Sequence, residues 1–305
     1  MRGPRRAPPL LFLALLVAGC ELRDVTTAAP ADMVIAEVVL VAGHAVQRAF
    51  LHRTLGVDGD SVPGARVEVH AADGRVMRFR ATDIGGVCTV PGARGGTCYL
   101  SVDSTVFEVE HGARYRLEIE LADGGRMHAT TTVPGAFEFI QPRAGTPACS
   151  VPPGSQLELT WSRSLDAGVY LVEADFGSSL AGAFPEIEPP DPFRTVGLSV
   201  GGADTTLVLP AELGVFDRFD EQATATLVAL QRGLPRESVA DVVVAAAEQN
   251  YVNWVRGGSF NPSGIVRIAS VRGDGTGVFG ALALRGFRVH GSSDGSGADH
   301  PSCFR

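Results

Sequence analysis

The chain has 305 residues, of which 45% are hydrophobic and 20% charged, and its formal net charge is −8. This is the balance of an ordinary globular protein, with enough residues for one or two hydrophobic cores. The acidic charge offers no basic surface for nucleic acid, so we expect no nucleic-acid partner. The 37 glycines and 19 prolines favour a β-rich fold with many turns.

The first twenty residues predict export and lipid attachment. A basic segment, MRGPRR, precedes the apolar stretch LLFLALLVAG, which is too short to cross a bilayer as a helix. The sequence Val17-Ala18-Gly19-Cys20 follows and resembles a bacterial lipobox. We therefore expect a lipoprotein signal peptide over residues 1–19, lipid on the sulfur of Cys20, and a short tether over residues 20–32. The alternative is an ordinary signal peptide with an incidental cysteine.

Residues 33–134 predict an immunoglobulin-like β-sandwich. In ARVEVHA, residues 65–71, apolar and polar side chains alternate, and Asp73-Gly74 turns the chain into a second alternating segment. Residues 115–133 repeat this pattern of strand, turn and strand. Gly112 lies three residues before Tyr115, which resembles the tyrosine corner of such sandwiches, where the phenol bonds to the backbone.

Residues 135–290 predict a second β-domain, similar to a fibronectin type III module. Trp161 ends one alternating segment and Tyr170 opens the next. We also expect strands at residues 205–210 and 223–230, and an exposed loop over the proline-rich residues 181–193.

One segment of the second domain departs from the β pattern. In residues 236–258, Val239, Val242, Val243, Ala246 and Ala247 recur at helical spacing, with Ser238 before them as a cap and Gly257-Gly258 after them. This pattern predicts a helix, whereas the run VVV taken alone would suit a strand. Residues 291–305 form a Gly/Ser-rich tail. The expected fold is therefore mainly β, with two tandem sandwich domains and one short helical segment.

Four cysteines follow Cys20, namely Cys88, Cys98, Cys149 and Cys303. Export permits disulfides, and four cysteines allow three pairings. The turn-rich segment between Cys88 and Cys98 favours a bridge across a hairpin, which leaves Cys149 to pair with Cys303. The alternative is a redox or metal site, and neither C-x-x-C spacing nor Cys/His clustering supports it.

Gly275, Gly277 and Gly280 match G-x-G-x-x-G, the pattern that holds a dinucleotide pyrophosphate. That fingerprint needs a helix after the last glycine, whereas ALALRGFRV follows and reads as a strand. We therefore expect no nucleotide, and interpret the glycines as a turn before the last strand, with Val278 and Phe279 in the core.

Other patterns for chemistry are incomplete. GSSDG matches the nucleophile-elbow pattern at Ser293, but only Asp299 and His300 follow it as partners. The seven histidines lack metal-ligand spacing, and DGDS at residues 58–61 lacks the ligand number of a calcium loop. We expect no cofactor, no metal and no catalytic residue.

Four motifs in order resemble a known family. They are PGARVEV at Pro63–Val69, the Y-x-L-x-I strand from Tyr115, TTVP at Thr131–Pro134, and GVFGA at Gly277–Ala281. Together they resemble the domain-of-unknown-function 4249 family of bacterial outer-membrane lipoproteins, although Asp274-Gly275-Thr276 departs from its last motif. The resemblance implies a Gram-negative envelope and association with a TonB-dependent outer-membrane receptor. It implies no catalytic residue.

Three functions follow from these observations. The first is a lipid-anchored, non-catalytic binding or scaffolding lipoprotein of the envelope. The second is a carbohydrate-binding lipoprotein, with Trp161, Trp254 or Tyr251 as an exposed platform. The third is an envelope hydrolase that uses histidine or acidic residues such as Glu186 and Glu188.

Overall fold

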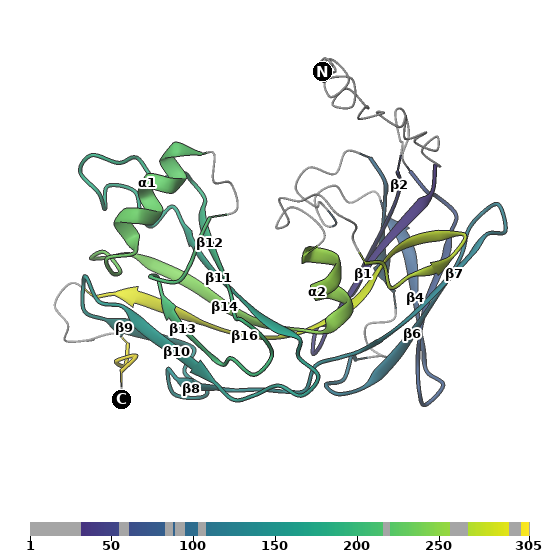
Figure 1. The fold of residues 1–305 in the computed structure, drawn as a ribbon, viewed down its shortest axis with the longest axis horizontal. Helices are drawn as coiled ribbons and strands as arrows, with labels where there is room; N and C mark the ends of the chain where they lie inside the picture. Colours follow the sequence, from purple (N-terminus) through teal and green to yellow (C-terminus); the bar gives the residue numbers. More distant parts are fainter. Residues whose placement is uncertain are drawn as a thin grey trace, which may run out of the picture. The chain divides into compact units, whose positions relative to one another are not determined.

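The computed structural model describes residues 32–54, 61–82, 88, 95–102, 108–215, 220–256, 268–292 and 300–304. Cys20, residues 58–60, Ser293 and Asp299 lie outside the described residues, so the predictions made on them are not addressed by the structure. The fold of the described part is mainly β, as predicted, with two short helices (Figure 1).

Seven strands of the described chain make the first β-region. They are β1 (Val34–Val41), β2 (Arg48–Arg53), β3 (Arg66–Ala71), β4 (Val76–Thr82), β5 (Thr97–Ser101), β6 (Arg114–Glu120) and β7 (Arg126–Thr132). Their spatial order is β1-β2-β5-β4-β3-β6-β7. At one end of this order β1 pairs with β16 (Gly275–Gly291), and at the other β7 pairs with β15 (Arg272–Gly273). Because β15 and β16 are separated only by Asp274, the seven strands close on a single C-terminal segment.

The second β-region has two sheets. Its strands are β8 (Phe139–Gln141), β9 (Ala148–Val151), β10 (Leu157–Trp161), β11 (Val169–Gly177), β12 (Phe193–Leu198), β13 (Thr206–Leu209) and β14 (Val239–Ala247). One sheet has the order β12-β11-β14-β16, with β9 also on β16, and the other has the order β13-β10-β8. Aromatic pairs join the two sheets: Trp161 meets Tyr170 at 5.2 Å between ring centroids, and Phe139 meets Phe287 at 5.1 Å.

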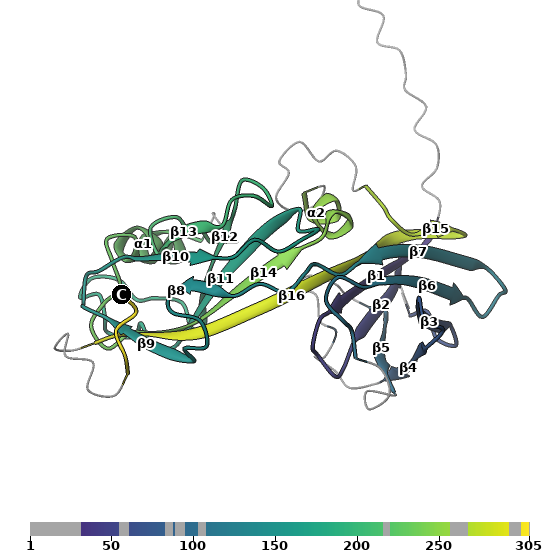
Figure 2. The same ribbon diagram turned by 90° about the horizontal axis from the view of Figure 1, so that it is seen from below.

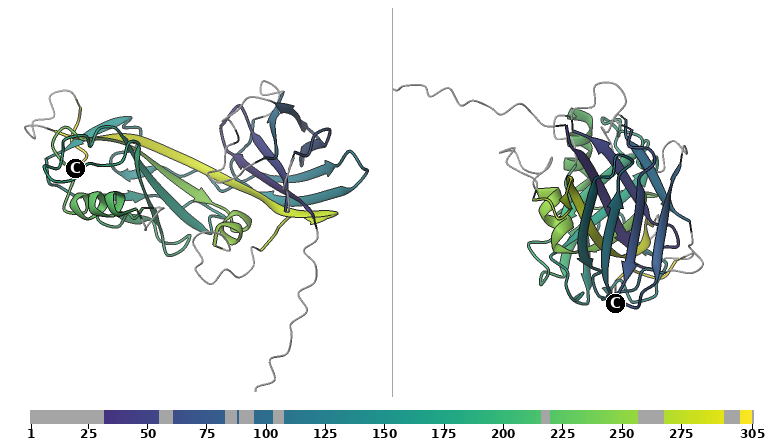
Figure 3. Two further views of the ribbon diagram at one scale, coloured as in Figure 1. Left: turned by 90° about the horizontal axis from the view of Figure 1, so that it is seen from above. Right: turned by 90° about the vertical axis from the view of Figure 1, so that its right-hand side faces the viewer.

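Strand β16 belongs to both regions. Its 17 residues extend over about 56 Å at the usual rise of a strand (Figure 2). Residues 275–282 pair in parallel with β1, and residues 282–290 pair antiparallel with β14. Figure 3 shows this long C-terminal strand in yellow. The predicted boundary at residues 134/135 assigns all of β16 to the second domain, whereas its first half completes the first β-region. One continuous hydrophobic core contains residues of both regions.

The predicted tyrosine corner is present. The Tyr115 hydroxyl accepts a hydrogen bond from the Glu110 backbone N–H at 2.9 Å. Tyr170 forms a similar bond in the second region, since its hydroxyl accepts from the Ser164 backbone N–H at 2.7 Å. In both regions a buried tyrosine therefore satisfies a backbone donor of the chain that precedes its strand.

Two predicted elements are wrong. The helix expected over residues 236–258 is instead strand β14 as far as Ala247, followed by helix α2 (Gln249–Arg256). Both faces of β14 are covered near its end, so its apolar residues lack the alternation that marks a half-exposed strand. The strand expected at residues 223–230 is helix α1 (Glu221–Leu230), which Asp220 caps by accepting the Ala223 N–H at 3.0 Å.

Neither helix of the described chain has both the length and the apolar character that crossing a membrane requires.

Candidate ligand pocket beside helix α2

The glycines of the G-x-G-x-x-G pattern lie within β16 rather than in a turn before it. Gly277 has a φ of +137°, and a Cβ there would lie 2.0 Å from the Ala36 carbonyl oxygen of β1. A Cβ on Gly280 would lie 2.9 Å from the Tyr251 Cβ of α2. The glycines therefore allow β16 to approach β1 and α2 closely. Val278 and Phe279 are buried, as predicted.

Helix α2 is fixed to β16 by its first residues. The Glu248 carboxylate caps the helix by accepting the N–H groups of Asn250 at 2.7 Å and Tyr251 at 3.1 Å. The Asn250 side chain donates to the carbonyl oxygens of Thr130 at 2.9 Å and Phe279 at 3.1 Å. Glu248 is buried, and this burial raises its pKa. These bonds hold α2 against both β7 and β16.

A pocket of about 400 Å³ lies beside α2. The residues that line it are Glu37, Val39, Val41, His44, Val46, Gln47, Arg48, Phe50, Cys88, Tyr251 and Leu282. Strands β1 and β2 contribute the outward-facing side chains of one wall, and α2 and β16 contribute Tyr251 and Leu282. We call this cavity the α2 pocket.

A buried glutamine shapes the loop at the edge of the α2 pocket. The Gln47 side chain is only 1% exposed. Its amide accepts from the Val41 N–H at 2.8 Å and donates to the carbonyl oxygens of Val41 at 2.9 Å and His44 at 2.7 Å. These bonds close the loop between β1 and β2, so His44 and Val46 are held in place at the pocket.

The electrostatics of the α2 pocket centre on Tyr251. Burial raises the pKa of the Tyr251 phenol, and the nearby carboxylates of Glu37 and Glu173 raise it further. Glu37 lies on β1 and Glu173 on β11, so the two acids approach from different strands. The Glu37 carboxylate lies 3.9 Å from the His52 ring nitrogen, and the His52 ring stacks on Phe50 with centroids 5.3 Å apart.

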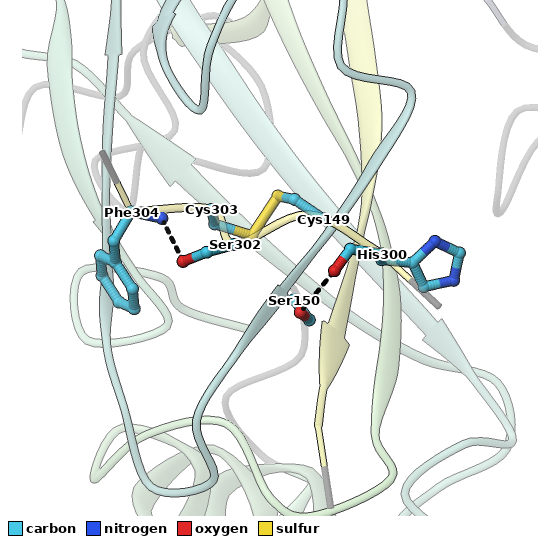
Figure 4. The surroundings of a disulfide bond; sticks show 6 residues. All are labelled: Cys149, Ser150, His300, Ser302, Cys303 and Phe304. Atoms are coloured by element: carbon cyan, nitrogen blue, oxygen red, sulfur yellow. Dashed lines mark hydrogen bonds between the residues drawn. A yellow bond between two sulfur atoms is a disulfide. The ribbon is translucent and has the colours of Figure 1, made fainter. Parts of the chain in front are cut away.

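The structure joins the four described cysteines as Cys88–Cys98 and Cys149–Cys303, with Cα atoms 5.6 Å and 5.0 Å apart. The first bridge borders the α2 pocket through Cys88. The second ties the C-terminal segment to β9 (Figure 4). There Ser150 bonds through its backbone to Pro301 and Cys303, both at 2.9 Å, so this segment extends the sheet beside β9.

The other residues singled out from the sequence do not assemble into a site. His290 and His300 stack with ring centroids 4.1 Å apart. Burial is the main cause that lowers the pKa of His290, and the charge of His300 lowers it further. Within the described ranges, three or more His, Cys, Asp or Glu residues nowhere gather in a way that could hold a metal. Glu186 and Glu188 are exposed on the loop before β12.

The expected aromatic platform is wrong for both tryptophans. Trp161 is 1% exposed and packs on Tyr170 inside the second sandwich. Trp254 is 8% exposed on α2. Tyr251 is half-buried and lines the α2 pocket.

The α2 pocket itself was not foreseen. A signal for it exists in β1, whose sequence VIAEVVLV places Val39 and Val41 on the face that a half-exposed strand gives to polar residues. This face is apolar because α2 and the loop from Val41 to Gln47 partly cover it. Which residues provide that cover is not visible in the local pattern.

Comparisons with known proteins give little further guidance. No family model matches the sequence, and no curated protein matches it. Among solved structures, a crystal structure of a DUF4785 family protein from Legionella pneumophila is similar with a TM-score of 0.21 and 9% sequence identity. The match covers 68% of this chain and 51% of that one, so the chain spans about half the length of that structure. A likeness this remote supports no inference about function.

Proposed function

We propose that this chain is a lipid-anchored envelope lipoprotein that acts as a non-catalytic binding protein and holds a small ligand in the α2 pocket. The observation that supports the anchor is the state of its cysteines. The chain has five, and two disulfides use four of them, which leaves Cys20. Disulfides belong to oxidising compartments, and an odd cysteine in an exported protein needs a separate role. The lipobox supplies that role as a thioether to diacylglycerol.

The resemblance to outer-membrane lipoproteins suggests the location and a protein partner. We place the chain on the outer membrane of a Gram-negative cell, beside a TonB-dependent receptor. Twelve residue steps separate Cys20 from Asp32, where the described structure begins. A fully extended tether of that length reaches about 40 Å, which lets the folded part contact a neighbouring membrane protein.

Binding is favoured over catalysis by the lining of the α2 pocket. Its walls are largely apolar, with a few polar groups on different elements, which is the usual composition of a ligand site. The sulfur of Cys88 is committed to a disulfide, so it is not a nucleophile. The burial of Trp161 and Trp254 removes the observation that favoured a carbohydrate platform.

The anchor is tested by cell fractionation. Wild-type protein is expected in the membrane fraction, and the Cys20→Ala variant in the soluble fraction. The Cys149→Ala/Cys303→Ala variant serves as a matched control, because it also removes cysteines but leaves the lipobox intact. Wild-type protein that is soluble after cell breakage would contradict the anchor.

The ligand role of the α2 pocket is tested with an environment-sensitive apolar dye and the full chain carrying Cys20→Ala. Val39→Arg places a charged side chain on the pocket wall and should abolish dye binding. Val200→Arg makes the same change in the loop after β12, where Val200 is 89% exposed, and should leave binding unchanged. Equal dye binding by both variants would place the site elsewhere.

The receptor partner is tested by recovery of the tagged lipoprotein from native envelopes in mild detergent. A TonB-dependent receptor should be enriched over a sample prepared from cells that lack the tag. Recovery of abundant envelope proteins only would remove this part of the proposal.

A further inference from the structure

The α2 pocket also indicates the charge of the ligand it takes, an inference that rests on the proposed binding role. Its wall contains a partly buried carboxylate, that of Glu37 on β1. The side chain of Glu37 is 18% exposed, and that of Glu173, an acid near Tyr251 from the side of β11, is half-buried. The bases that line the pocket, His44 and Arg48, are both exposed.

Aromatic rings accompany the acid. In the register of β1 with β2, Glu37 lies directly opposite Phe50, so their Cβ atoms are separated by about 5 Å. Tyr251 adds a second ring from α2. A carboxylate beside aromatic faces is the arrangement that binds an ammonium group, because the cation gains from both the charge and the ring quadrupole.

The remainder of the wall is suited to an apolar body. Val39 and Val41 from β1 and Leu282 from β16 lie side by side, since Val41 pairs with Leu282 in the parallel register. Val46 extends this surface toward solvent and is 48% exposed. A ligand that places its charge near Glu37 can therefore lay an alkyl or aryl group along these side chains.

We propose that the α2 pocket binds an amphiphilic ammonium compound, with its cation held by the Glu37 carboxylate and the rings of Phe50 and Tyr251, and its apolar group packed on Val39, Val41 and Leu282. The His52 ring nitrogen lies 3.9 Å from the same carboxylate. An anionic amphiphile of equal size would place its charge against the Glu37 carboxylate. Binding of such an anion at this position is therefore disfavoured.

The test compares three probes of equal chain length by calorimetry, using the full chain with Cys20→Ala. Hexylammonium is expected to bind at least tenfold more tightly than hexanoate, with 1-hexanol between them. Glu37→Gln should weaken hexylammonium binding about tenfold and leave 1-hexanol unchanged. Phe50→Leu should weaken the ammonium several-fold, because the wall stays apolar while the ring is lost. Glu118→Gln, on the outer face of β6 and away from the pocket, is the matched control.

The outcomes separate this inference from the proposed binding role. If all three probes bind wild type equally, or hexanoate binds best, the preference for ammonium is overturned while the pocket remains a binding site. If none binds and the apolar dye also fails, the proposed role of the pocket is overturned. The probe series on wild type decides the charge preference even if Glu37→Gln does not fold.

Discussion

The two halves of β16 show how one strand serves two kinds of packing. From Gly277 to Ala281 every residue is buried, because the inner face of the strand meets the first core and α2 covers the outer face. From Leu282 onward, buried Ala283, Phe287 and Val289 lie on the inner face only, and more exposed residues stand between them. Continuous burial therefore marks the half that is covered on both faces, and alternation marks the half that is covered on one.

This difference assigns a structural function to each half. The first half is held by close backbone approach to β1 and by the packing of α2 on it. The second half is held by pairing with β14 and β9, and its end lies beside a disulfide. Substitutions that act on one half and spare the other test whether the two are stabilised in these different ways.

The largest effect is expected from the disulfide near the end of the second half. Cys149→Ala with Cys303→Ala opens a loop with a sequence separation of 154, for which the chain-entropy relation gives a loss of about 5 kcal/mol. The other bridge, Cys88–Cys98, which borders the α2 pocket, has a separation of 10 and should contribute about 3 kcal/mol. Denaturant unfolding without reductant measures both. Equal losses from the two double variants would show that loop length does not govern them.

Removal of a core ring from the first half comes next. Phe279 is 0% exposed, so Phe279→Ala is expected to lower the free energy of unfolding by about 3–5 kcal/mol. Phe304→Ala is a matched control, because Phe304 is 38% exposed, and its loss should stay below about 1 kcal/mol. A loss below about 1 kcal/mol for Phe279→Ala would mean that this half is not packed as the structure has it.

A single added methyl group compares the halves directly. Gly277→Ala puts a Cβ 2.0 Å from the Ala36 oxygen at a φ of +137°, so strain and overpacking should cost about 3 kcal/mol or more. Gly286→Ala makes the same change in the second half, where the nearest atom is the Val242 oxygen at 3.1 Å, and should change stability by about 1 kcal/mol or less. Thermal unfolding of the two variants measures the contrast. Similar melting temperatures would contradict it.

The alternating parts of this fold could be predicted from the sequence, because their residues report which face is covered. The strands around Val67 and Leu117 show the period of two, and Tyr115 with Gly112 indicates the corner that the structure contains. Residues 239–247 gave the wrong element, since an apolar run that is covered on both faces has no period that separates strand from helix. In α1 the β-branched Thr224, Thr226 and Val228 favoured the prediction of a strand. The segment is a helix, and Asp220 caps its first turn.

The α2 pocket could not be predicted for a different reason. Glu37 and Phe50 face each other through strand register, which the alternation of β1 and β2 specifies only in part. Tyr251 is some two hundred residues distant and reaches the pocket because Gly280 leaves room for α2 on β16. A contact of this kind depends on how elements pack rather than on a local pattern, so only the apolar outer face of β1 gave any sign of it.

The smallest predicted effects concern one carboxylate on each half, and their pH dependences should have opposite signs. Glu248 caps α2 above the first half, and burial raises its pKa above its usual 4.5. The stability that this shift contributes is complete below that value and is lost as pH rises through the pKa of the folded state. The free energy of unfolding, measured with urea from pH 4 to 8, should therefore decrease with rising pH more steeply for wild type than for Glu248→Gln. The substitution itself should cost about 1 kcal/mol, because it changes the cap of α2.

Asp241 lies beside the second half, where the Arg288 side chain binds its carboxylate at 2.7 Å and 2.9 Å and lowers its pKa below 3.8. This contribution is present above the usual pKa and is lost as pH falls through the lowered one, so Asp241→Asn should reduce stability at pH 7 and have less effect at pH 2–3. The pair is more than half exposed, which limits the effect to below about 1 kcal/mol. For each variant, the stability difference from wild type is plotted against pH. If the two plots have slopes of the same sign, burial of Glu248 under α2 does not determine the titration of its carboxyl group.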